Sequence, residues 1–152
     1  MPQSNYSRNQ NYNGNRNGNA APVITPLFKA EELNESNYVD LAEKVIKAHD
    51  QSRDKITTSQ LRSLFSLMTE MREIIRVRPE KIMGEMLISR IQYIKMRFVY
   101  AAGRGEKGVP DFMKQSVLIE CLNSVKDSSK RFELVCKYME ALVAYHKYYI
   151  NK

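Results

Sequence analysis

Three arginines recur at seven-residue intervals in the middle of the chain: Arg90, Arg97 and Arg104. Seven residues make nearly two turns of an α-helix, so these side chains fall on almost the same side, about 10.5 Å apart. Tyr93 and Tyr100 each follow an arginine by three residues and lie close to the same row. The spacing is comparable to one or two nucleotides of backbone, so the pattern predicts phosphate binding along one helix edge.

Carboxylates are scarce around this row. No Asp or Glu occurs from residue 86 to residue 105, so pairing within the helix leaves Arg90, Lys95 and Arg97 without a partner. The competing interpretation is a solvated helix edge, with the tyrosines at the margin of the core and their hydroxyls in water. The sequence leaves both interpretations open for each residue.

Further cations surround the expected start of the preceding helix. Thr57 and Gln60 fit a capping box, in which the Thr hydroxyl accepts from a free amide and the Gln side chain reaches back. Free amides and the helix dipole at such a start add to nearby positive charge. The full set of candidate binding residues is Arg53, Lys55, Arg62, Arg90, Lys95, Arg97 and Arg104.

The overall charge agrees with a polyanionic partner. The chain carries 24 Lys and Arg against 17 Asp and Glu, a net charge of +7. The segment 53–107 holds 12 basic and 6 acidic residues, so much of the excess lies there. Contacts with phosphates carry no base information, so we expect salt-sensitive, sequence-tolerant binding to nucleic acid.

Signatures of catalysis do not accompany this charge. The sequence contains no phosphate-binding loop, no HExxH and no carboxylate cluster suited to Mg²⁺. His49 and His146 have no evident nucleophile near them in sequence, and we expect His49 to interact, partly charged, with a helix C-terminus. Cys121 and Cys136 lack metal-ligand spacing and are expected to be buried thiols. We predict a protein that is not an enzyme, with no cofactor and no metal site.

Helical periodicity positions the candidate residues. Apolar residues recur at spacings of three and four from residue 36 onward, and no segment alternates long enough for a strand. The expected helices begin at Ser36, Thr57, Pro79, Asp111 and Ser128 or Ser129. The predicted fold class is all-α: a compact antiparallel bundle of about five helices joined by short loops, in a domain spanning residues 36–152.

The first 35 residues have a different composition. Seven of the first 19 residues are Asn, and such a segment has too little apolar surface to offset its ordering entropy. We predict a disordered, Asn-rich tail over residues 1–35. The start of the chain lacks the apolar run of a secretory signal, and no segment approaches the roughly 20 apolar residues of a membrane span. The predicted location is cytoplasmic, with no membrane partner.

Three segments together resemble a known family. Ile56–Arg62, Lys95–Arg104 and Tyr138–Tyr149 are similar, in this order and spacing, to the small subunit of the type III-A CRISPR-Cas (Csm) interference complex. The resemblance spans about residues 36–150, and the Asn-rich tail departs from the family pattern.

The resemblance implies a role in antiviral defence. It implies a non-catalytic helical subunit that stacks in a few copies beside the backbone repeat subunit and the large polymerase-like subunit. This subunit would line the channel for the crRNA–target RNA duplex. The basic positions that match the family are Arg62, Lys95, Arg97 and Arg104, and the choice of RNA over DNA rests on the resemblance.

Two other function classes remain open at this stage. The segment from Thr57 to Phe65 is similar to part of a helix-turn-helix, which would suit a free-standing DNA-binding regulator. A short preceding helix with a tight Gly turn is lacking. A hydrolase with an unrecognised site is the third hypothesis, and no plausible nucleophile supports it.

Overall fold

A computed structural model describes residues 24–79 and 84–150 of the chain, and all regular structure in these two stretches is helical. The elements are η1 (Ala30–Glu32), α1 (Tyr38–Asp50), α2 (Thr58–Val77), α3 (Glu85–Gly103), α4 (Val109–Ser116), α5 (Leu118–Asn123) and α6 (Ser129–Tyr149). The all-α class is confirmed, since the described residues contain helices and turns but no strand.

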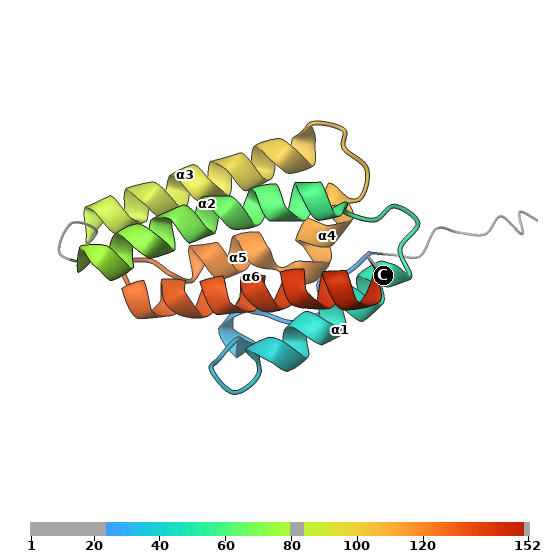
Figure 1. The fold of residues 1–152 in the computed structure, drawn as a ribbon, viewed down its shortest axis with the longest axis horizontal. Helices are drawn as coiled ribbons and strands as arrows, with labels where there is room; N and C mark the ends of the chain where they lie inside the picture. Colours follow the sequence, from blue (N-terminus) through green and yellow to red (C-terminus); the bar gives the residue numbers. More distant parts are fainter. Residues whose placement is uncertain (1–23, 80–83, 151–152) are drawn as a thin grey trace, which may run out of the picture.

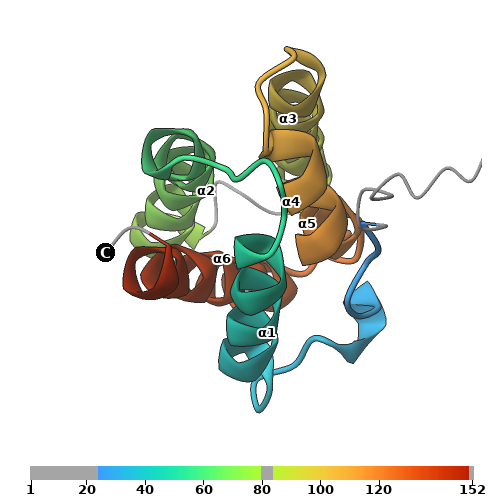
Figure 2. The same cartoon turned by 90° about the vertical axis from the view of Figure 1, so that its right-hand side faces the viewer.

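Helix α6 is the central element of the bundle. It packs against α1 on one side and α2 on the other, and α2 runs antiparallel to both α6 and α3 (Figure 1). Its buried side chains are Phe132, Leu134, Val135, Cys136, Tyr138, Met139, Leu142 and His146. Helix α3 is an outer helix that packs against α2, α4 and α5, as the view along the bundle shows (Figure 2). One edge of α3 therefore runs beside α2, while its outer face is open.

The caps of α2 and α6 follow the expectations from sequence. The amide of Gln60 donates to Thr57 Oγ1 at 3.1 Å, and the amide of Thr57 donates to Gln60 Oε1 at 2.9 Å. The Ser128 hydroxyl accepts from the amide of Arg131 at 3.1 Å. Each cap satisfies amides that the first helical turn cannot pair, and so fixes where the helix begins.

The expected fourth helix is divided in two. Val117 has a φ of 58°, in the left-handed region, and separates α4 from α5. This conformation is costly for a β-branched residue, so tertiary contacts must hold it. The Tyr138 hydroxyl donates to the carbonyl of Ser116 at 2.7 Å, and that carbonyl would pair with the amide of residue 120 in an unbroken helix. The side chains of Val117 and Leu118 at this turn are buried in the core.

The folded domain begins earlier than residue 36. Phe28, Ala30 and Leu33 are buried in the core, and Phe28 makes an edge-on contact with the ring of Tyr138. Arg131 donates to the carbonyls of Ala30 and Leu33 at 2.6 Å each. The apolar residues of this segment thus extend the core, and the expected boundary moves towards the N-terminus. Residues 1–23 of the predicted tail lie outside the described residues.

The start of the third helix also differs from the expectation. Helix α3 begins at Glu85 rather than at Pro79, after Gly84, whose φ is 55°. Residues 80–83, which the expected helix would include, lie outside the described residues.

Candidate nucleic-acid interface

The arginine row, Arg90, Arg97 and Arg104, lies along the line where α3 meets α2, here called the α2–α3 seam. All three side chains are exposed, because α3 turns its apolar residues Leu87, Ile91, Ile94 and Phe98 inward. The hollow beside Arg90 is lined from α2 by Leu67, Glu70, Met71 and Ile74. The groove beside Arg97 and Arg104 is lined from α2 by Ser59, Gln60, Ser63, Leu64 and Leu67. The heptad spacing thus yields the predicted row.

Arginines and tyrosines form pairs one helical turn apart on this seam. Arg97 Nη1 donates to the hydroxyl of Tyr93 at 2.9 Å, and its guanidinium carbon lies 5.9 Å from the ring centroid. The guanidinium carbon of Arg104 lies 5.7 Å from the ring of Tyr100. Tyr93 and Tyr100 remain 47% and 62% exposed, so the rings belong to the surface and not to the core.

Carboxylates contribute little to the seam. Arg104 lies 3.7 Å from Glu106, which also accepts from Gln60 Nε2 at 3.2 Å. In the described part of the chain, no carboxylate lies within ion-pair distance of Arg90 or Arg97. Arg90 and Arg97 thus form no ion pair within the described fold, although Glu70 lines the hollow beside Arg90.

Lys95 does not join the row. It is half-buried, and its Nζ donates to Asn123 Oδ1 of α5 at 2.8 Å. It precedes Arg97 by two residues, a rotation of about 200° around α3, so it faces α5 while the arginines face α2. The sequence grouped it with the row because the two share one helix, and the structure separates them.

Arg62 is exposed but lies outside the seam. It follows Gln60 by two residues, a rotation of about 200° around α2, whereas Gln60 lines the groove. The N-terminus of α2 thus presents Arg62 to solvent on a different side from Arg97 and Arg104.

The loop between α1 and α2 brings two more cations to the Arg104 end of the bundle. Arg53 is exposed, and Lys55 pairs with Asp50 at 3.2 Å. The backbone of Lys55 lies directly against Gly108, in the loop that follows Arg104. A Cβ at Gly108 would fall 2.2 Å from the Lys55 carbonyl carbon, and φ there is 90°, so this contact requires glycine. Arg53 and Lys55 thereby lie at the same end as Arg104.

Two buried histidines hold this loop, a role that the sequence did not reveal. The amide of Ile56 donates to His49 Nε2, and His146 Nε2 donates to the carbonyl of Ile56, both at 2.9 Å. His49 Nδ1 in turn donates to Gln115 Oε1 at 2.8 Å. Burial lowers the pKa of His49, so it is neutral rather than partly charged as we had expected. Both rings bind backbone one residue before the cap of α2, which fixes where that helix starts.

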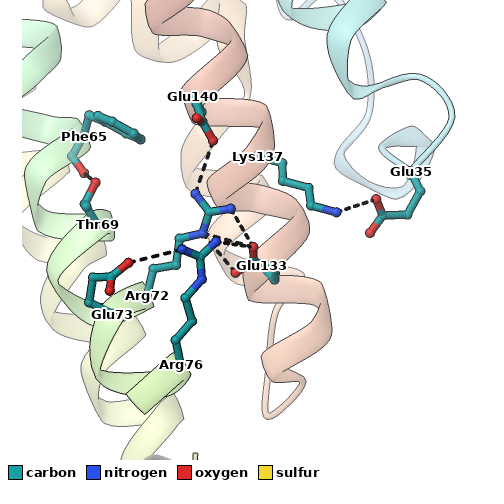
Figure 3. A network of polar contacts seen from close by, with 9 residues as sticks. All are labelled: Glu35, Phe65, Thr69, Arg72, Glu73, Arg76, Glu133, Lys137 and Glu140. Carbon is teal, nitrogen blue, oxygen red and sulfur yellow. Dashed lines mark hydrogen bonds and ion pairs between the residues drawn. The ribbon is translucent and has the colours of Figure 1, made fainter. Parts of the chain in front are cut away.

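A second group of arginines is fully paired within the fold (Figure 3). Arg72 of α2 donates to Glu133 at 2.6 Å and to Glu140 at 3.2 Å, both on α6. Arg76 pairs with Glu73 at 3.2 Å and with Glu133 at 3.4 Å. The hydrogen bonds that Arg72 donates to the Glu133 carboxylate lower the pKa of Glu133 and raise the pKa of Arg72. These cations serve the contact between α2 and α6.

The remaining reactive side chains offer little chemistry. Cys121 and Cys136 are buried, and burial raises the pKa of each thiol to about 12, so both are protonated at neutral pH. Within residues 24–79 and 84–150, no three His, Cys, Asp or Glu side chains are grouped so as to hold a metal ion. No helix of the described chain has the length and apolarity to cross a membrane.

Comparison with known proteins assigns the family. The family model described as Csm2 Type III-A matches residues 32–152. The CRISPR system Cms protein Csm2 of Streptococcus thermophilus is 37% identical over 123 residues, covering 79% of this chain and 97% of that protein. The protein of the same name from Mycobacterium tuberculosis (strain CDC 1551 / Oshkosh) is 35% identical over 116 residues, covering 75% and 92%. That of Enterococcus italicus is 29% identical over 124 residues, covering 73% and 88%.

The match with the family model begins at residue 32 and includes every element from α1 to α6. The Asn-rich first 19 residues lie outside that match. The resemblance to the small subunit is thereby confirmed, and the chain belongs to the Csm2 family of type III-A CRISPR systems.

Proposed function

We propose that the chain is a non-catalytic structural subunit that lines the channel for the crRNA–target RNA duplex of a type III-A effector complex. It does so through sequence-independent contacts with phosphates. The observation that carries this proposal is the exposed arginine row on the α2–α3 seam, where Arg90 and Arg97 have no carboxylate partner among the described residues.

The geometry of the row suits phosphates rather than base edges. The arginines follow one another along the outside of the bundle with a helix rise of about 10.5 Å between them. The major groove of an RNA helix is too deep and narrow for side chains to read, so contacts fall on backbone and sugars. Specificity then belongs to base pairing by the guide strand.

The other candidate cations have lesser roles in this proposal. Arg53 and Lys55 extend the positive surface beyond Arg104, although Lys55 must exchange Asp50 for a phosphate. Lys95 must likewise give up Asn123, and Arg62 faces a different side. We therefore expect Arg97 and Arg90 to contribute most to RNA affinity, and Lys95 and Arg62 least.

The test compares two triple variants of the full chain that remove equal charge. The seam variant is Arg90→Gln, Arg97→Gln and Arg104→Gln; the control is Lys44→Gln, Lys130→Gln and Lys147→Gln, at exposed positions of α1 and α6. We expect the seam variant to bind a labelled RNA duplex at least tenfold more weakly. In a plot of the logarithm of the binding constant against the logarithm of the salt concentration, the magnitude of the slope should fall by about 0.7–0.9 for each phosphate that the variant no longer neutralises.

The control variant should stay within about threefold of the native affinity, since diffuse charge contributes less than positioned charge. Equal losses in both variants would show that net charge, and not the seam, binds RNA. Duplex DNA of the same sequence, measured in parallel, tests the choice of RNA: a tighter complex with DNA contradicts it.

Absence of catalysis has its own measurement. Labelled RNA incubated with the purified chain in Mg²⁺ or Mn²⁺ should stay intact. Reproducible cleavage that a single substitution in the chain abolishes would contradict a purely structural role.

The outer face of α3 supports contacts with protein partners, which we propose to be copies of this chain, the backbone repeat subunit or the large subunit. Ile88, Met96 and Val99 are 41%, 55% and 52% exposed there, and phosphates cannot bury aliphatic side chains. Met96→Gln with Val99→Gln should weaken co-purification with those subunits while RNA affinity of the isolated chain stays unchanged. If co-purification is unaltered, the contact with other subunits must lie on another face of the chain.

A further inference from the structure

The α2–α3 seam holds a groove that is built around an aromatic ring. The groove has a volume of about 240 Å³ and lies between the start of α2 and the end of α3. Tyr100 lines it, with Arg97 on one side and Arg104 on the other, each about one helical turn away. Ser59 and Ser63 of α2 line the opposite wall.

The ring of Tyr100 has no role in the core that would explain its position. It is 62% exposed, whereas Tyr138, whose hydroxyl pairs with Ser116, is fully buried. A single exposed tyrosine is common on protein surfaces; what distinguishes Tyr100 is its place in the groove, with Arg97 and Arg104 on either side.

Each arginine lies over its tyrosine ring only near the outer limit of about 6 Å for a cation–π contact, so neither ring is tightly covered. The guanidinium carbons lie 5.7 Å from the Tyr100 centroid and 5.9 Å from the Tyr93 centroid. A guanidinium stacked flat on a ring would lie at roughly 3.5–4.0 Å. Arg97 is instead held at the hydroxyl end of Tyr93 by the 2.9 Å hydrogen bond. Because Tyr100 is 62% exposed and Tyr93 47% exposed, much of each ring surface is still accessible to a planar group.

An open ring flanked by cations fits an unpaired nucleotide. Aromatic side chains stack on the bases of single strands, while neighbouring basic groups hold the backbone. In a duplex, each base is already stacked and paired, and its faces are hidden. The charged seam alone suits any RNA, but the rings add a preference that paired RNA cannot satisfy.

We propose that Tyr100 stacks on an unpaired RNA base in this groove while Arg97 and Arg104 contact the phosphates beside it. Tyr93 offers a second ring two turns earlier on the same edge. This inference rests on the proposed RNA-binding function. It adds that the RNA bound in the groove is unpaired and that Tyr100 contacts its base. Glu106 also lines the groove, where Arg104 and Gln60 hold its carboxylate, so Arg97 is the stronger of the two phosphate contacts.

The experiment uses the full chain and a 12-nucleotide RNA that carries 2-aminopurine near its centre, alone or paired with its complement. Stacking of 2-aminopurine on a ring quenches its fluorescence, and anisotropy of an end label gives the affinity. The variants are Tyr100→Leu, Tyr100→Phe and the double variant Arg97→Gln with Arg104→Gln. Circular dichroism confirms that each variant folds, as expected for exposed positions.

We expect Tyr100→Leu to weaken single-strand binding by about five- to thirty-fold, as for the loss of one stacked base. It should also abolish the quenching and leave duplex affinity within about twofold. Tyr100→Phe should keep both affinity and quenching, because it retains the ring. The arginine variant should lose affinity for both RNAs.

Two other outcomes overturn the inference. If Tyr100→Leu binds the single strand as tightly as the native chain while the arginine variant loses affinity, the proposed phosphate contacts stand and the proposed stacking on Tyr100 is wrong. Equal losses of single strand and duplex in Tyr100→Leu would mean that the ring merely supports its arginines. A native chain that binds neither RNA would remove the proposed function itself.

Discussion

Helix α2 lies between α6 and α3, and the arginines differ between its two contacts: they are paired with carboxylates where α2 meets α6 and exposed where it meets α3. On the α6 side, Arg72 is only 13% exposed and its guanidinium is shared between Glu133 and Glu140. On the α3 side, Arg90 and Arg97 are exposed and have no carboxylate partner among the described residues; Arg97 pairs with a tyrosine.

The difference separates two uses of charge. A half-buried guanidinium must be paired, because an uncompensated charge there is costly, and the pair then helps hold two helices in register. An exposed arginine held by a phenol keeps its charge available to an outside anion, while the ring limits its motion. A count of arginines thus says little about binding until the partners of each are known.

The largest expected effect comes from removing the paired arginine. Arg72→Ala should lower the free energy of unfolding by about 2–3 kcal/mol, because it leaves Glu133 and Glu140 side by side without their shared partner. Arg97→Ala should lower it by less than about 0.5 kcal/mol. Urea denaturation followed by circular dichroism measures both. Similar losses would break the distinction between the seams.

A carboxylate introduced into the groove should pair with the arginines of the α2–α3 seam, as Glu133 pairs with Arg72 where α2 meets α6. Ser63→Glu places an acid among Arg97, Arg104 and the groove wall, and we expect RNA affinity to fall about tenfold by anisotropy titration. The matched control is Ser66→Glu, on an exposed part of α2 outside the groove, which should change affinity by less than threefold. Equal effects would point to net charge alone.

Low pH should weaken the ion pairs that Glu133 forms between α6 and α2. The pKa of Glu133 is lowered in the folded state, so its contribution is present above its unfolded pKa and is lost as the pH falls through the folded value. The stability advantage of the native chain over Glu133→Gln should therefore be about 1 kcal/mol at pH 7 and shrink below about pH 4.5. A pH-independent difference, measured by thermal unfolding, would assign Glu133 a role in packing.

The smallest expected effect is a gain in binding. Glu106→Gln removes the carboxylate beside Arg104 while leaving an amide for Gln60, and RNA affinity should rise about two- to threefold. Asp127→Asn, at an exposed turn, is the control of equal charge and should change affinity less. A fall in affinity on Glu106→Gln would mean that Glu106 itself contacts the RNA.

Local patterns in the sequence predicted much of this molecule. The capping box at Thr57 and Gln60, the Ser128 cap and the heptad spacing of the arginine row all depend on residues a few positions apart. Helical geometry fixes such relations wherever the helix lies, so they survive in the fold.

Contacts between distant residues were beyond the same reasoning. Lys95 is held by Asn123, and Arg131 by the carbonyls of Ala30 and Leu33. Neither pair has a spacing that a helix repeat could reveal. The break at Val117 likewise follows from the Tyr138 hydroxyl, which reaches the Ser116 carbonyl from α6.

The sequence by itself determined the all-α class, the family and the single edge that carries Arg90, Arg97 and Arg104. Only the tertiary structure decided which cations remain available, because pairing depends on what packs opposite each side chain. Glu133 and Glu140 of α6 neutralise Arg72, whereas Ser59 and Ser63 of α2 lie across the groove from Arg97. The partner helix therefore determines whether an arginine stabilises the fold or stays free to bind a phosphate.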